Sequence, residues 1–180
     1  MRRLSLLTVA ALLMCLPMVG EGHSIKYHPG ANVTVLAAAA LDAATTGTGE
    51  EVLYTYSLPA NTAGKDGDTL EFFFTAQAAA NGNSKTIRFR VGGIGGTSLC
   101  GVAGTGNSTA ISCRALCQRV SVSTMWCWTS GYIAASPQGS ATSLTGLDLS
   151  AAISIVATGT TPTAAADVAI KSVFIAKIAQ

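Results

Sequence analysis

The sequence predicts an all-β protein, an antiparallel β-sandwich of jelly-roll-like type with about eight or nine strands. Three observations support this fold class. Most segments after residue 50 alternate apolar and polar side chains with a period of two, the pattern of a half-buried strand. Gly, Asn, Asp and Pro separate these segments at short intervals. No stretch after Gly22 has convincing helical periodicity, because the Ala-rich residues 35–44 pass directly into Thr and Gly.

The alternating segments can be placed in chain order. We expect residues 1–22 to form a hydrophobic leader, residues 23–50 an N-terminal strand and an Ala/Thr/Gly linker, and residues 51–180 the sandwich domain. Within the sandwich, alternation predicts strands over residues 51–58, 68–78, 85–91, 110–120, 123–133, 150–159 and 167–178. The Ala/Thr/Gly-rich residues 37–51, the glycine-dense residues 92–109 and residues 136–146 are predicted to be connections.

Each alternating strand has one face that we assign to the core. The predicted inward residues are Leu70, Phe72, Phe74 and Ala76, then Ile87, Phe89 and Val91, then Ile111, Cys113, Ala115 and Cys117, and finally Val168, Ile170, Ser172, Phe174, Ala176 and Ile178. On this assignment Phe73, Val173 and Ile175 point outward. Because exposed apolar side chains need cover, these three residues predict the surface of a symmetric oligomer.

The N-terminal residues 1–22 resemble a secretory signal peptide. Arg2 and Arg3 precede an apolar run from Leu4 to Val19, and the small residues Gly20 and Gly22 follow at a plausible cleavage spacing. The run is shorter than the roughly 20 apolar residues of a membrane span. An arm that is retained for assembly is the alternative interpretation.

Composition indicates a single domain with few charges. The chain has 180 residues, of which 49% are hydrophobic, and this is enough for one sizeable core. Charged residues are only 11% and the formal net charge is +2, with the basic residues scattered along the chain. Nucleic-acid binding by counterion release requires a basic stripe, so we expect no nucleic-acid partner.

Four cysteines lie close together in the sequence, at Cys100, Cys113, Cys117 and Cys127. An even number of clustered cysteines fits disulfide formation in an oxidising compartment, and three pairings remain open. Zinc binding is the rival interpretation, but no Cys-x-x-Cys pair occurs and both histidines lie far away in the sequence. Burial as small apolar side chains is a further alternative.

An aromatic cluster follows the cysteines, with Trp126, Trp128 and Tyr132 near Arg114 and Arg119 in the sequence. Aromatic side chains on the rim of a β-sandwich can stack against sugar rings, which suggests a glycan platform. Packing of the tryptophans in the core explains the same cluster and is the interpretation that we favour, although the alternation of this strand does not settle which of its faces is buried.

Candidate catalytic and metal sites have simpler explanations. Asp66 and Asp68 could supply oxygen ligands for Ca²⁺, but the ion takes six to eight oxygens and the EF-hand spacing does not occur. We interpret them as an Asp-Gly turn that opens a strand, and residues 81–84 as an Asn-Gly turn. His23 and His28 lie outside the strand-rich body, and no carboxylate pair stands out. We therefore predict no metal site, no cofactor and no catalytic residue.

Three stretches carry a resemblance to a known group of proteins. They are "YSLPANT" at residues 56–62, "NGNSKTIRFRVGG" at residues 81–93 and "LDLSAAISIVATGT" at residues 147–160. Residues 50–180 thereby resemble the β-sandwich domain of tailed-bacteriophage virion proteins, of the tail-fibre and head-fibre type. The resemblance implies a jelly-roll-like fold, homotrimeric assembly, and a role in virion architecture or host attachment, and it implies no catalytic residues.

Two functions follow from the sequence. The first is a non-enzymatic structural protein of a virion appendage, fibre or decoration, which assembles with itself as a trimer and with other virion proteins. The alternative is a secreted, disulfide-stabilised carbohydrate-binding module that recognises a surface glycan. The first places the protein in the virion and the second outside the cell.

Overall fold

The computed structural model describes residues 32–106, 110–133, 136–161 and 167–179, and every regular element within these ranges is a β-strand. In chain order the strands are β1 (Asn32–Ala44), β2 (Gly49–Leu58), β3 (Thr69–Ala78), β4 (Asn81–Val91), β5 (Thr97–Gly106), β6 (Ala110–Ser121), β7 (Thr124–Ile133), β8 (Ser136–Leu144), β9 (Ile153–Thr161) and β10 (Val168–Ala179). Across these ranges no helix could span a membrane. The leader-like residues 1–22 and both histidines lie outside the described residues.

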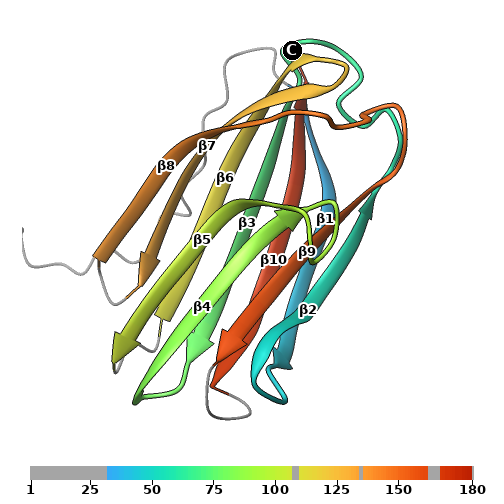
Figure 1. Cartoon of the computed structure of the whole chain (residues 1–180). Coiled ribbons are helices and arrows are strands. Elements are labelled where there is room, and N and C mark those ends of the chain that lie inside the picture. Colours follow the sequence, from blue (N-terminus) through green and yellow to red (C-terminus); the bar gives the residue numbers. More distant parts are fainter. Residues whose placement is uncertain (1–31, 107–109, 134–135, 162–166, 180) are drawn as a thin grey trace, which may run out of the picture. The chain divides into compact units, whose positions relative to one another are not determined.

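The strands form two antiparallel sheets that pack as a sandwich, as the sequence predicted (Figure 1). Sheet A has the order β1-β10-β3-β6-β7-β8, and sheet B has the order β2-β9-β4-β5. Four strand pairs are nested like the two arms of one long hairpin, in the order β4·β5, β3·β6, β2·β9 and β1·β10 from the inside outward. Successive pairs alternate between sheet B and sheet A. This winding is the jelly-roll topology. The β7–β8 hairpin is inserted between β6 and β9 and extends sheet A beyond β6.

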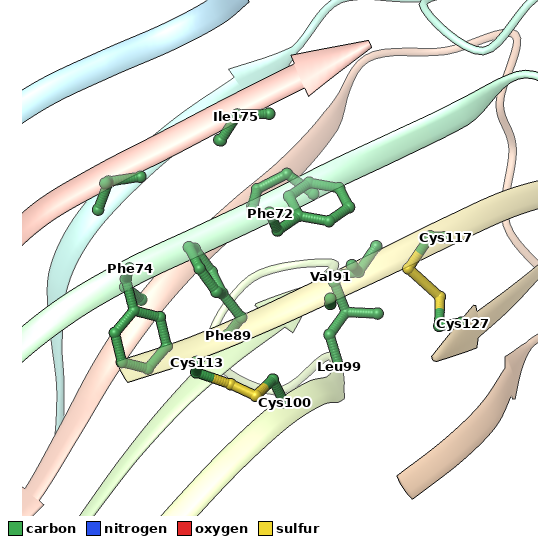
Figure 2. Close-up of a cluster of buried hydrophobic side chains, with 14 of the residues drawn as sticks. Phe72, Phe74, Phe89, Val91, Leu99, Cys100, Cys113, Cys117, Cys127 and Ile175 are labelled. Carbon is green, nitrogen blue, oxygen red and sulfur yellow. A yellow bond between two sulfur atoms is a disulfide. The ribbon is translucent and has the colours of Figure 1, made fainter. Parts of the chain in front are cut away.

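The core lies between the sheets and uses the side chains that alternation selected. Phe72 and Phe74 of β3 face Phe89 of β4, with ring centroids 6.1 and 4.9 Å apart (Figure 2). Burying one such side chain stabilises the fold by about 1.5–3 kcal/mol. The inward assignment is confirmed for all predicted residues of β3, β4 and β6, namely Leu70, Phe72, Phe74, Ala76, Ile87, Phe89, Val91, Ile111, Cys113, Ala115 and Cys117.

Strand β10 departs from its predicted alternation. Its pairing with β3 shifts between Ile170 and Ser172, where the strand carries one extra residue. One inserted residue moves every later side chain to the opposite face of the sheet. Val173 and Ile175 are therefore buried in the core, and the prediction that they form an outward oligomer surface is wrong. Phe73 does lie on the outer face of sheet A, where it is half-buried.

Three segments that were predicted as connections are largely strands. Residues 37–51 complete β1 and begin β2, while residues 92–109 and 136–146 contain β5 and β8. Ala, Gly and Ser have little intrinsic preference for strands, which is why the sequence pattern favoured loops. Pairing with β10, β4 and β7 supplies the backbone hydrogen bonds that keep these segments extended. The sandwich thus begins with β1 and not at residue 51.

The predicted Asn-Gly turn is a bulge at the start of β4. The pairing of β4 with β5 shifts between Asn81 and Lys85, and the Asn83 N–H donates to Asn81 Oδ1 at 3.1 Å. Lys85 is buried, and its ammonium donates to the backbone oxygens of Asn81 and Asn83 and to Asn81 Oδ1. Asp167 accepts hydrogen bonds from the side-chain amides of both asparagines. Lys85 and Asp167 thus hold the bulge as part of the fold.

Candidate functional site

Strand β7 presents a row of aromatic side chains on the outer face of sheet A. Met125 and Cys127 point inward and are buried. Trp126, Trp128 and Tyr132 point outward and are 54%, 55% and 53% exposed. The favoured interpretation that both tryptophans pack in the core is therefore wrong. We call these three outward residues the aromatic row.

The aromatic row is long, and it is open on the side of the sheet edge. At about 3.3 Å per residue, the two tryptophans lie roughly 7 Å apart along the strand, and the row from Trp126 to Tyr132 extends about 20 Å. The residues of the edge strand β8 that pair with Trp126, Trp128 and Ser130 are Ser143, Ala141 and Gly139, all small and exposed. Since directly paired residues share a face, these small side chains leave Trp126 and Trp128 open on the side of β8.

Two disulfides fasten the strands below the aromatic row, and Figure 2 shows both. Cys117 of β6 is joined to Cys127 of β7, its direct partner across the strands. Cys100 of β5 is joined to Cys113 of β6 and so links sheet B to sheet A. The sequence had left the pairing open. The first disulfide attaches the inserted hairpin covalently to the eight-stranded roll, at the residue between the two tryptophans.

A salt bridge lies on the same outer face, next to the aromatic row. Arg114 of β6 pairs with Ser130 of β7, which is the outward residue between Trp128 and Tyr132. The Arg114 Nε donates to Glu71 Oε1 of β3 at 2.6 Å. Glu71 is 3% exposed and Arg114 32% exposed. The sequence placed Arg114 near the aromatic cluster but offered no sign of its carboxylate partner, because that contact is between strands far apart in the chain.

The outer face of sheet B has a different character. Glu50 of β2 accepts hydrogen bonds from Arg90 Nε and Nη2 at 2.7 and 2.8 Å, and Thr158 Oγ1 of β9 donates to it as well. Arg88 lies 3.6 Å from the same carboxylate. The hydrogen bonds from Arg90, and then that from Thr158, outweigh desolvation and lower the pKa of Glu50 from 4.5 to about 2. The Glu50 carboxylate is thus fully engaged by groups of the fold itself.

The acidic turn before β3 is also part of the fold. Asp68 is buried and accepts from the Lys65 N–H, and its carboxylate lies 3.0 Å from Lys177 Nζ of β10. Asp66 pairs with Arg119 at 2.9 Å. Both carboxylates thus have cationic partners, and the Asp68 N–H closes the turn by donating to the Lys65 carbonyl at 3.1 Å. In the part of the chain that the structure describes, no three His, Cys, Asp or Glu side chains form a group that could hold a metal ion.

The aromatic row is suited to binding a ligand, because its exposed rings can stack against one. An indole face attracts the C–H face of a sugar ring, and it stacks on other flat ligands. A rigid, disulfide-fastened strand holds such faces in fixed positions, which lowers the ordering cost of binding.

Comparison with known proteins shows likeness in fold alone. No protein-family model and no curated protein sequence matches the chain. Among solved structures, the CBM2 module of the evolved Dit of Lactobacillus casei BL23 phage J-1 is 8% identical, with a TM-score of 0.42, over 85% of this chain and 92% of that one. The VP2 subviral particle of infectious bursal disease virus is 10% identical, with a TM-score of 0.38, over 91% of this chain and 37% of that one.

A plant protein is similar to the same degree. Lectin I from Ulex europaeus, in complex with the methyl glycoside of α-L-fucose, is 9% identical, with a TM-score of 0.35, over 82% of this chain and 91% of that one. At such identities and TM-scores these likenesses carry no argument about function, which has to come from the aromatic row itself.

Proposed function

We propose that this protein is a non-enzymatic β-sandwich module that binds carbohydrate through the aromatic row of β7. The observation that supports the proposal is the alignment of Trp126, Trp128 and Tyr132 on one side of one strand, each about half exposed. Large aromatic side chains left in water are costly and mark interaction sites when they gather. Sugar rings combine an apolar C–H face with a hydroxyl rim, and so fit an aromatic surface bordered by small and polar residues.

The proposal places the module outside the reducing cytoplasm. Its two disulfides form and persist only under oxidising conditions. The signal-like residues 1–22 are consistent with export. A secreted protein and a module displayed on a virion surface both meet this condition, and in both cases a glycan of a cell surface is within reach.

The proposal also makes the module a binder and not a hydrolase. Glycoside hydrolysis uses two carboxyl groups that flank the bond to be cleaved. Register places Glu71 two strands away from the aromatic row, and this carboxylate is already engaged by Arg114. Elsewhere in the described sandwich, Glu50 is held by an arginine partner and Asp68 by a lysine partner.

Intrinsic fluorescence tests the proposal directly, because Trp126 and Trp128 are the two tryptophans of the chain. Titration with soluble polysaccharides, selected on a glycan array, should quench or shift the emission with saturation. Trp128→Ala should weaken binding by about tenfold or more. The matched control is Val35→Ala, an exposed apolar residue on the same face of sheet A but on the opposite edge strand, and it should bind normally. Array binding that survives loss of both tryptophans would refute the proposal.

A second function, symmetric self-assembly as part of a virion, is favoured by a different observation. Val33 and Val35 of the edge strand β1 are 38% and 56% exposed, so an apolar edge is available for another copy. Native mass spectrometry at micromolar concentration should then show a trimer that Val35→Ser weakens. A clean monomer would reject this function without touching the glycan proposal.

A further inference from the structure

The aromatic row is interrupted at one position by polar groups. Between Trp128 and Tyr132, strand β7 turns Ser130 outward. Register places Arg114 beside Ser130 on one side and Gly139 on the other. A ligand that lies along β7 therefore passes the Ser130 hydroxyl between two aromatic contacts, with Arg114 on the neighbouring strand β6.

The guanidinium of Arg114 is held in place by Glu71 of the neighbouring strand β3. Its Nε donates to Glu71 at 2.6 Å, and the carboxylate is 3% exposed while the arginine is 32% exposed. An arginine has five N–H donors in a planar fork, and this bond uses one of them. The pair thus restrains the guanidinium, and about a third of the Arg114 side chain remains exposed to solvent.

The surface around the aromatic row has no net charge. The cross-strand rows that pass through Trp126, Trp128, Ser130 and Tyr132 extend over all six strands of sheet A. Among the residues in register in these rows, as far as the structure describes them, the charged ones are Glu71 and Arg114, and they form a pair. An acidic polymer would find no excess of positive charge here, whereas a neutral hydroxyl can accept from the guanidinium without a charge mismatch.

We propose that the ligand of the aromatic row is an extended, uncharged polysaccharide that lies along β7, and that Arg114 hydrogen-bonds the sugar unit between Trp128 and Tyr132. Glu71 is the positioning residue that aims the guanidinium and cancels its charge. The length of the row, about 20 Å, fits several consecutive sugar units and not a single terminal sugar. This inference rests on the proposed carbohydrate-binding function and names the ligand class of the same site.

Matched neutral and acidic polymers test the ligand class. Binding of the full chain is measured by tryptophan fluorescence and on an array that pairs each backbone with an anionic form, for example hydroxyethyl cellulose with carboxymethyl cellulose, and dextran with dextran sulfate. We expect binding to a neutral member that changes less than about twofold between roughly 0.05 and 0.5 M NaCl. Binding restricted to acidic forms, with a loss above tenfold over that range, would overturn this inference and leave carbohydrate binding intact. Failure of every glycan to bind would refute both.

Variants of the salt bridge test the role of each partner. Arg114→Met should lower affinity for the neutral polymer about tenfold, and Arg114→Lys should restore only part of it because the planar fork is lost. Glu71→Gln should leave an uncompensated guanidinium, so that the acidic polymers gain affinity and binding becomes sensitive to salt. If Glu71 only supported the fold, Glu71→Gln would not change the preference between neutral and acidic polymers. If Glu71→Gln does not fold, as judged by near-UV circular dichroism, the two Arg114 variants still decide, and unchanged binding in both contradicts the proposal.

Discussion

The outer faces of the two sheets follow the same β-alternation but are used differently. On the outer face of sheet B, Arg88 and Arg90 both pair with Glu50. Sheet A turns out the aromatic row, whose side chains remain about half exposed. Charges that satisfy each other contribute to the fold, whereas exposed aromatic groups on a fastened strand are available to a ligand. The contrast shows that a candidate binding site is found where side chains able to bind a ligand are not already covered or paired within the protein.

The largest expected effect separates binding from stability. Replacing both tryptophans, Trp126→Ala with Trp128→Ala, should weaken binding to the array-selected glycan by about 100-fold, on the order of 3 kcal/mol. The free energy of unfolding should change by less than about 0.5 kcal/mol, since neither side chain packs in the core. Isothermal titration calorimetry and urea unfolding measure the two quantities. A large loss of stability with little change in binding would show that the two tryptophans support the fold and do not form a binding surface.

The next effect compares the two disulfides. Cys117→Ser with Cys127→Ser, and Cys100→Ser with Cys113→Ser, open loops of similar length, with sequence separations of 10 and 13 residues. Each pair should cost about 3 kcal/mol of unfolding free energy by the loop-entropy estimate. Only the first should also weaken glycan binding, because it frees the strand that carries the tryptophans. Equal loss of binding in both double variants would show that the disulfide below the row has no special role.

Sheet B supplies the third effect, on stability alone. The pKa of Glu50 is about 2 in the folded protein against 4.5 for the unperturbed group. Because the folded pKa is lowered, the carboxylate stabilises the fold fully above about pH 4.5, and this contribution is lost as the pH falls toward 2. Glu50→Gln should remove roughly 2 kcal/mol at pH 7 and flatten the acid limb of the stability profile. Unfolding curves between about pH 2 and pH 7 measure this loss of stability, and glycan binding should be unchanged.

The smallest effect concerns the outermost arginine of the same network. Arg88 lies 3.6 Å from Glu50 and is about one-third exposed, so its attraction is screened by water. Arg88→Gln should cost about 0.5 kcal/mol or less, well below Arg90→Gln, whose guanidinium makes two short hydrogen bonds to Glu50. Thermal melts of the two variants side by side give the comparison. Equal losses would mean that the network acts as one unit.

Local alternation predicted a large part of the fold. The inward faces of β3, β4 and β6 follow from side-chain periods within each segment, and their phenylalanines do form the core. The candidate site was predicted only as an alternative, since the sequence favoured burial of the tryptophans. An N-terminal strand was expected within residues 23–50, but residues 37–44 of β1 and the strands β5 and β8 were predicted as connections, because their Ala, Gly and Ser residues carry no pattern of their own and are extended by their neighbours.

By itself, the sequence determined the all-β class, the alternating core faces and the presence of cysteines able to pair. The tertiary structure alone decided which face of β7 is outward, which cysteines join, and where β10 changes face between Ile170 and Ser172. The physical reason is that a period of two defines two faces but does not say which one is buried. That choice depends on pairing with strands distant in the chain, and one extra residue in a strand reverses it.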